Sequence, residues 1–376
     1  MEIDLDRAVE RGIVNQQQAA GLAELMRDEG AQSLAPAGEP LMDGEIDRDD
    51  EGFRFIAGFA DIFLAIGVVM LLYGMSTSNL TATLGGHAAT IAAIWGLSEI
   101  LATRLRRALP SMILAVAFVF QAVSLCAVYI LGNRIGDPLF FRQWADADNP
   151  LLWLFAAALV AALVHYWRFR LPFSLALIGI AIAGLIVSQS YMVLGRDMVS
   201  FIVPILLVTG LAIFAAAMRF DMADILRTTR NSDNAFWLHI IASPLIVHSL
   251  MWQSAIWLGV GDLKKWRPGG SDRFSEFPEI ISTLAIVVLL IFAVLIVVAL
   301  VIDRRAMLVS SLLYVSLAVS YYVTQQGAAA SAVTYTPIII GAGIIAVGIG
   351  WRPMRRFLFS VLPLASIVPY VPPATR

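Results

Sequence analysis

The sequence has little charge for its length. Asp, Glu, Lys and Arg make up 14% of its 376 residues, whereas 59% are hydrophobic. A soluble domain has roughly 25% charged residues and about 45–50% apolar ones. So few polar side chains could not cover the surface of the chain in water. The composition therefore excludes an ordinary soluble domain and predicts a protein that lies in the lipid bilayer.

Cysteine is almost absent as well. Cys126 is the only one, which excludes an intramolecular disulfide and a multi-cysteine metal site. The enzyme signatures GxSxG and HExxH and the Walker loop do not occur. We therefore expect no cofactor, no metal and no nucleic-acid partner, and an enzyme is the less favoured class. The first 52 residues lack the apolar core of a signal peptide, so we expect them to be retained.

What the chain has instead is a series of long apolar runs. A transmembrane helix needs about 20 consecutive apolar residues, and about ten runs approach that length. They cover residues 53–73, 83–103, 110–131, 151–167, 172–194, 199–218, 235–257, 280–302, 305–323 and 333–350. The sequence thus predicts an all-α, polytopic bundle of transmembrane helices over residues 53–351. The eighth helix has no polar residue after Thr283, so we expect it to face lipid.

Positive charge is distributed unevenly between the predicted loops. With the N-terminus in the cytoplasm, the cytoplasmic segments hold 19 of the 26 Lys and Arg residues and the outer loops hold 7. An excess of Lys and Arg is typical of cytoplasmic loops. We therefore expect both termini to be cytoplasmic.

The two ends of the chain are polar in different ways. Residues 1–30 are predicted to form a small cytoplasmic helical hairpin that needs a partner surface, and residues 31–52 an acidic flexible linker. Residues 1–52 hold four arginines and 14 acidic residues, so their net charge is 4 − 14 = −10. Residues 352–376 begin with three arginines and become proline-rich. We expect an interfacial basic helix on anionic lipid headgroups, followed by a disordered tail.

Four stretches carry a resemblance to a known family. They are RGIVNQQQAAGL near the N-terminus, FIAGFADIFLAIGVVMLLYG, FWLHIIASPLIVHSL and VIDRRAMLVSSLLY. In them the chain resembles a bacterial family of predicted multi-pass inner-membrane proteins of unknown function, with a short N-terminal helical hairpin. The resemblance implies a bacterial inner-membrane location and about ten helices. It implies no activity and no role for any residue.

Three titratable residues lie in the cytoplasmic half of the predicted bundle. Asp61 is about 12 Å, and Glu99 and His239 are each about 6 Å, from the cytoplasmic end of their helices. A charge at mid-membrane costs at least about 2.5–3.5 kcal/mol, so each group needs a partner, a proton or a water-filled cavity. Small neighbouring residues indicate close helix contacts. The three residues are interpreted as an ion-, proton- or substrate-binding site, as a hydrogen-bonded cluster that locks helices together, or as groups that do not meet.

The run FWLHIIASPLIVHS contains His239, Pro244 and His248. Nine residues separate the histidines, which places them on opposite faces of a straight helix and about 13.5 Å apart along its axis. They therefore cannot hold one metal ion together. Pro244 predicts a kink between them. Pro244 and His248 are then either part of a gating segment or static packing.

Three functions are compatible with these features. A transporter of a small solute or of protons is preferred, because of the buried acidic groups and the kink. The alternative is a non-catalytic scaffold or signalling protein whose acidic hairpin, residues 1–30, binds a protein partner. A membrane-embedded enzyme would depend on the histidines alone. A polar cavity that reaches Asp61 and His239 would favour the transporter.

Overall fold

The computed structural model is helical throughout the part of the chain that it describes. It describes residues 59–78, 83–131, 150–257, 273–305, 307–308, 311–312, 315–316, 319–320, 329–363 and 367–373. Within these ranges there is no β-strand. The predicted hairpin, the acidic linker and most of the predicted span 305–323 lie outside them.

Within the described ranges, eight helices are long and apolar enough to cross a membrane. They belong to α3 (Phe59–Thr77), α4 (Leu84–Ser98) with its π-helical extension η2 (Glu99–Arg104), α5 (Ala108–Leu131), α7 (Pro150–Phe169), α8 (Phe173–Leu194), α9 (Met198–Ala223), α10 (Arg230–Trp257) and α13 (Ala329–Val361). A further long helix, α11 (Arg273–Ile302), ends in an apolar stretch at Val287–Ile302. The chain is thus an all-α protein with the spans of a multi-pass membrane protein.

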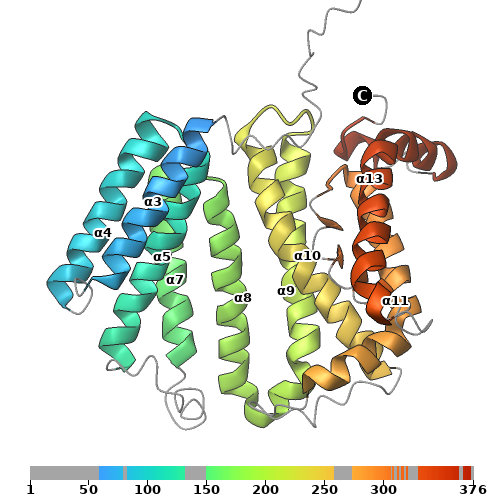
Figure 1. Cartoon of the computed structure of the whole chain (residues 1–376), viewed down its shortest axis with the longest axis horizontal. Coiled ribbons are helices and arrows are strands. Elements are labelled where there is room, and N and C mark those ends of the chain that lie inside the picture. Colours follow the sequence, from blue (N-terminus) through green and yellow to red (C-terminus); the bar gives the residue numbers. More distant parts are fainter. Residues whose placement is uncertain are drawn as a thin grey trace, which may run out of the picture. The chain divides into compact units, whose positions relative to one another are not determined.

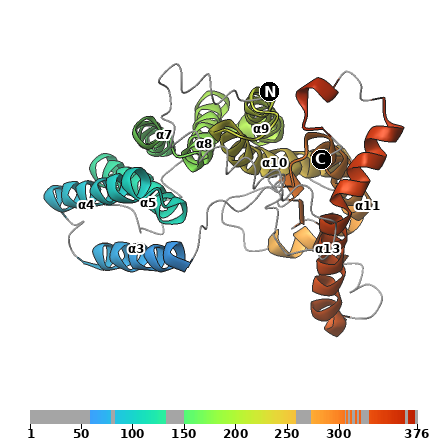
Figure 2. The ribbon, with the colours of Figure 1, turned by 90° about the horizontal axis from the view of Figure 1, so that it is seen from above.

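Helices that are neighbours in the chain pack against each other (Figures 1 and 2). α3 and α4 both contact α5, α5 contacts α7, and α7 contacts α8. α10 then contacts α8, α9 and α11, and its contact with α9 is the most extensive. Short turns join α7 to α8 and α9 to α10, so these pairs are antiparallel hairpins.

Four helices end in the same unusual backbone conformation. Arg106, Arg170, Arg227 and Asp303 have φ between 48° and 58°, in the left-handed region. A residue of this conformation commonly terminates a helix, although glycine is the usual choice. Because the helices alternate in direction, the four turns lie at one end of the bundle, drawn at the top of Figure 1. We call this end the turn end and the opposite one the far end.

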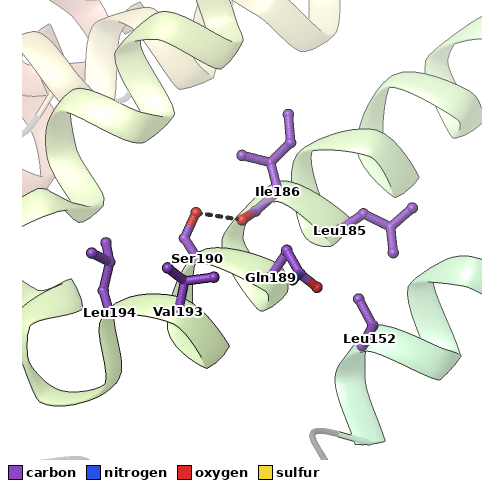
Figure 3. A pocket seen from close by; sticks show the side chains of 7 residues that line it. All are labelled: Leu152, Leu185, Ile186, Gln189, Ser190, Val193 and Leu194. Atoms are coloured by element: carbon purple, nitrogen blue, oxygen red, sulfur yellow. Dashed lines mark hydrogen bonds between the residues drawn. The ribbon is translucent and has the colours of Figure 1, made fainter.

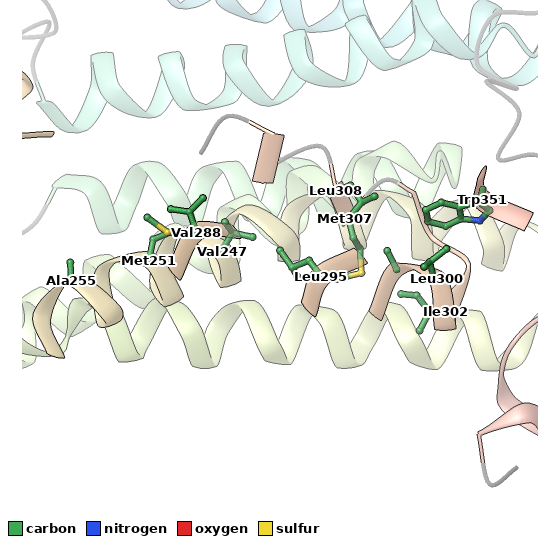
Figure 4. Close-up of a cluster of buried hydrophobic side chains, with 11 residues drawn as sticks. Val247, Met251, Ala255, Val288, Leu295, Leu300, Ile302, Met307, Leu308 and Trp351 are labelled. Carbon is green, nitrogen blue, oxygen red and sulfur yellow. The ribbon is translucent and has the colours of Figure 1, made fainter. Parts of the chain in front are cut away.

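The largest hydrophobic core joins α10, α11 and the residues that follow α11 (Figure 4). Val288 and Leu295 of α11 are buried in it, whereas Leu290 and Val294 are exposed. The prediction that this helix simply faces lipid is therefore wrong for one of its faces. An apolar stretch has no polar residue to mark the face that packs, so the sequence could not distinguish the two.

The C-terminal helix differs from the predicted span and separate interfacial helix. α13 runs as one helix through residue 350 and the basic stretch to Val361, with Pro353 inside it. Beyond it, a short 3-10 turn forms at Val368–Tyr370. Arg355 donates hydrogen bonds to the carbonyl oxygens of the two prolines that follow, Pro372 and Pro373. Two residues of the predicted tail thus accept hydrogen bonds from a buried guanidinium.

Candidate functional site

The most buried charged group of the described residues is a cluster at the turn end. His239 Nε2 lies 2.8 Å from Asp221 Oδ2. Arg304 donates to the same carboxylate through Nε and Nη2. Arg304 Nη2 also lies 3.1 Å from both the hydroxyl and the carbonyl oxygen of Ser232. We call Asp221, Ser232, His239 and Arg304 the Asp221 cluster.

The cluster connects three parts of the chain. Asp221 is in the last turn of α9, Ser232 and His239 are in the first half of α10, and Arg304 follows α11. The side chains of His239 and Arg304 are 0% and 2% exposed and that of Asp221 is 8% exposed. Two charges at such depth require each other, because removing one partner leaves a charge buried without compensation.

A second set of contacts surrounds Asp303, the residue before Arg304. Arg227 Nη1 lies 3.3 Å from its Oδ2, and Trp351 Nε1 donates to its Oδ1 over 2.7 Å. Arg355 of α13 donates to the carbonyl oxygen of Leu300 over 2.9 Å. These bonds place the end of α13 beside the end of α11 and the α9–α10 turn.

Asp224 stabilises the α9–α10 turn. Its carboxylate accepts hydrogen bonds from the backbone N–H groups of Thr228 and Thr229 and from the Thr229 hydroxyl. Burial alone would raise the pKa of Asp224. These hydrogen bonds, with one from the backbone of Ser232, outweigh burial and lower the pKa below its ordinary value. The group therefore remains a carboxylate and fixes the turn that carries Ser232.

The other two predicted site residues each have an arginine partner of their own. Asp61, 1% exposed at the start of α3, pairs with Arg107 at 3.1 Å. Glu99 opens the π-helical turn η2 and pairs with Arg168 at the end of α7, at 2.6 Å. Both pairs lie at the turn end, next to the α4–α5 and α7–α8 turns. They link α3 to α5 and α4 to α7.

The structure thus places Asp61, Glu99 and His239 in three separate ion-pair groups. All three lie toward one end of the bundle, but each is held by different partners. Sequence reasoning missed the partners. The predicted spans 199–218 and 280–302 end before Asp221 and Arg304, so both residues fall outside the predicted helices. The signal that could have found them is an acidic residue and an arginine within three residues of the end of an apolar run, in RFD and IDRR.

The two histidines of α10 face opposite sides, as their spacing predicts. His239 is fully buried, whereas His248 is exposed beside Trp252, with their ring centroids 6.1 Å apart. α10 continues as a helix through Pro244, which is also exposed. The preceding Ser243 donates a hydrogen bond to the carbonyl oxygen of Met307 over 2.6 Å. The helix is therefore tied to the segment after α11 immediately beside the proline.

Two hollows lie away from the turn end. A cavity of about 430 Å³ between α3, α4 and α5, the α3–α5 cavity, is lined by Val69, Leu72, Tyr73, Met75, Ser76, Thr90, Ile94, Ala117, Phe120, Gln121 and Ser124. A wider, open groove of about 610 Å³, the α7–α8 groove, is lined by Leu152 of α7 and by Leu185, Ile186, Gln189, Ser190, Val193 and Leu194 of α8 (Figure 3). Neither hollow is lined by Asp61, Glu99 or His239.

The two ends of the bundle therefore differ in chemistry. Val69 lies eight residues after Asp61, so the α3–α5 cavity begins about 12 Å from that ion pair along α3. The α7–α8 groove is at the end of α8 opposite its turn to α7. Charged side chains join helices at the turn end, and the two hollows, whose linings contain no charged side chain, lie in the other half of the bundle. Among the residues described, no three His, Cys, Asp or Glu side chains are grouped so as to hold a metal ion.

Comparison with family models, with curated proteins and with solved structures found no match to this chain. The class of the protein accordingly follows from its own fold. The part of the chain that the structure describes is all-helical, with eight candidate membrane spans and buried charged side chains.

Proposed function

We propose that the protein is a membrane transporter of a small uncharged solute, in a state closed at the turn end and open toward the far end. One observation carries the proposal. The ion pairs of Asp61, Glu99 and Asp221 all lie at the turn end, whereas the α3–α5 cavity and the α7–α8 groove, which described residues line, lie in the other half of the bundle.

Transporters expose a site to each side of the membrane in turn, by moving one group of helices against another. Ion pairs between helices at one end are suited to closing that end, because they can separate and reform. The kink residue Pro244 lies five residues after His239, so a bend there would act on the Asp221 cluster. In this proposal Asp61, Glu99 and His239 belong to the closure and do not contact the solute.

The turn end is proposed to be cytoplasmic. Among the described residues, arginines gather at this end in the α4–α5, α7–α8 and α9–α10 turns and directly after α11, as the positive-inside rule predicts for cytoplasmic segments. A bacterial inner membrane and membership of the family that the sequence resembles are part of the same proposal.

The alternatives have less support. An enzyme would need its histidine and carboxylate open to a substrate, but His239 and Asp221 are both buried. The scaffold hypothesis depends on residues 1–30, which lie outside the described residues.

Reciprocal labelling tests the transporter. Replacement of Cys126 by serine removes every native thiol, so a single cysteine can be introduced at Ser124 in the α3–α5 cavity or at Ser98 near the turn end. A membrane-impermeant maleimide, applied to sealed vesicles of both orientations, should label S124C from the far side and leave S98C unlabelled. Ser98 is on α4, away from the Asp221 cluster.

Adding Arg304→Gln should then reverse the pattern. Labelling of S98C should rise from the turn side while labelling of S124C falls, because opening one end of a transporter closes the other. If Arg304→Gln changes the labelling of S98C and leaves the labelling of S124C as before, the ion pairs only hold the helices together and the transporter proposal fails.

A further inference from the structure

The α3–α5 cavity has the chemistry of a binding site for one class of molecule. Its volume of about 430 Å³ falls in the usual range for small-molecule sites, which is about 300–1,000 Å³. Its lining includes no Asp, Glu, Lys, Arg or His. A charged ligand would lose its hydration there without gaining a counter-charge, so the lining selects an uncharged one.

The cavity opens between apolar side chains. Val69, Tyr73 and Phe120 line it and are 50%, 70% and 69% exposed. They lie on α3 and α5, two of the helices that are long and apolar enough to cross a membrane. In a bilayer these side chains face acyl chains, so a ligand that carries a hydrocarbon tail can reach the cavity sideways from the lipid.

The inner wall of the cavity is polar. Gln121 and Thr90 are 7% and 4% exposed, and both line the cavity. The Gln121 amide nitrogen lies 2.5 Å from Nδ1 of His87, a histidine that is 1% exposed. The amide nitrogen is the donor in this contact, so Nδ1 of His87 accepts. Gln121 therefore turns a donor toward His87 and keeps its amide oxygen as an acceptor.

The hydroxyl groups of Thr90 and Ser76 are hydrogen-bond acceptors as well. Thr90 donates its proton to the carbonyl oxygen of Gly86 over 2.9 Å, and Ser76 donates to that of Tyr73 over 2.9 Å. A hydroxyl whose proton is already committed can only accept from a ligand. Gln121, Thr90 and Ser76 thus offer acceptors, while Tyr73, Ser124 and the second N–H of the Gln121 amide add groups that can donate. The ligand group that complements such a lining is a hydroxyl, because it both donates and accepts a hydrogen bond.

From these observations we infer that the α3–α5 cavity binds a lipid alcohol, an uncharged amphiphile with a free hydroxyl head group and a hydrocarbon tail. The hydroxyl donates to the Gln121 amide oxygen or to the Thr90 hydroxyl oxygen, and the tail leaves between Val69 and Phe120. The inference rests on the proposed function, since it specifies the solute class for that site.

Three photoactivatable probes with the same diazirine acyl chains test the inference. They are a diacylglycerol, its O-acetyl derivative and the corresponding phosphatidic acid, each incorporated into nanodiscs that hold the full-length protein. Irradiation and peptide mass spectrometry then locate the labelled residues. The diacylglycerol should label residues 69–76 and 117–124 about three- to tenfold more than the acetylated probe, because one net hydrogen bond is lost on acetylation. The phosphatidic acid should label them least.

Variants separate the hydroxyl contact from general affinity for lipid. Gln121→Leu removes the acceptor at similar volume and should reduce diacylglycerol labelling to the level of the acetylated probe. Gln189→Leu in the α7–α8 groove is the matched control and should leave it unchanged. Should Gln121→Leu fail to fold, Thr90→Val removes the second acceptor with almost no change of shape and should give a partial reduction. Equal labelling by all three probes, preference for phosphatidic acid, or no effect of either cavity variant overturns the inference.

The two proposals can fail separately. If S124C and S98C show reciprocal labelling but the diacylglycerol labels the cavity no more than the acetylated probe, the solute class is wrong and the transporter proposal is retained. If the diacylglycerol labels the cavity as expected but reciprocal labelling is absent, the cavity is a static lipid-binding site and the transporter proposal fails.

Discussion

Arg304 is the cation that holds the Asp221 cluster together. Its guanidinium contacts Asp221 and Ser232 from a segment 83 residues further along the chain than Asp221. Its side chain is 2% exposed. Each of these contacts joins the end of α11 to α9 or α10, so the Arg304 guanidinium stabilises the packing of all three helices.

Arg304→Gln should therefore destabilise the protein strongly. The substitution leaves the Asp221 carboxylate buried without its arginine, and the loss of one partner of a buried pair costs about 3–5 kcal/mol. Equilibrium unfolding of the purified protein in mixed micelles would measure the change in free energy of unfolding. Arg168→Gln is the control, because Arg168 and Glu99 are 43% and 29% exposed and such a pair contributes about 0–1 kcal/mol. Similar losses for both variants would contradict the structural importance of the Asp221 cluster.

At the same scale, the sequence identified which buried groups need partners but not which partners they have. Asp61, Glu99 and His239 are all engaged at the turn end, and each partner comes from a different part of the chain. Arg107 follows Asp61 by 46 residues, and Arg168 follows Glu99 by 69. Pairings over such separations depend on how the helices pack, which local pattern cannot determine.

The contact between α9 and α10 depends on a glycine. A Cβ atom at Gly210 would lie 2.9 Å from the Ile246 side chain and 3.1 Å from the Ile246 backbone nitrogen. Small residues allow helix backbones to approach closely in membranes. The close approach falls two residues after Pro244, so it fixes the part of α10 where a bend would act.

Gly210→Ala should separate α9 from α10 and destabilise the bundle by about 1–3 kcal/mol, the usual cost of overpacking. The gain in helix propensity, about 1 kcal/mol, offsets only part of this. Gly67→Ala in α3 is the matched control: a Cβ atom there meets nothing within 4 Å, so stability should stay equal or rise. Thermal unfolding of the two variants in the same detergent compares them. If neither Gly210→Ala nor Gly67→Ala lowers the thermal stability, then α9 and α10 can move apart without loss of stability.

At the scale of the helices, the length of an apolar run predicts that a helix is present. It does not predict where the helix ends or which of its faces packs against other helices. Eight predicted spans coincide with helices of the right length and composition. The extension of α9 to Ala223 and the single helix α13 were missed, because charged residues and Pro353 end an apolar run without ending the helix. The π-helical turn at Glu99 was also missed, since no sequence pattern marks it.

For the whole molecule, the direction of α13 determines how many times the chain crosses the membrane. Trp351 of α13 donates a hydrogen bond to Asp303 and Arg355 donates one to the Leu300 carbonyl oxygen, so the end of α11 and this part of α13 both lie at the turn end. α13 begins at Ala329, 22 residues before Trp351 and so about 33 Å away. The ten spans predicted from the sequence include one more crossing between Asp303 and Ala329, which would return the chain to the far end.

Reporter fusions test this topology directly. Green fluorescent protein fused after residue 376 should fluoresce, because an even number of crossings leaves the C-terminus on the cytoplasmic side with the N-terminus. Alkaline phosphatase fused after residue 265, between α10 and α11, should be active, because seven crossings place it outside. Exchanging the reporters gives the controls: the fluorescent protein after residue 265 should be dark, and the phosphatase after residue 376 should be inactive. Suppose that, at the C-terminus, the fluorescent-protein fusion is dark and the phosphatase fusion is active. Residues 305–323 then do not cross the bilayer. The Asp303–Trp351 bond would then be incompatible with α11 and α13 both spanning the membrane, and the assignment of a single turn end would have to be abandoned.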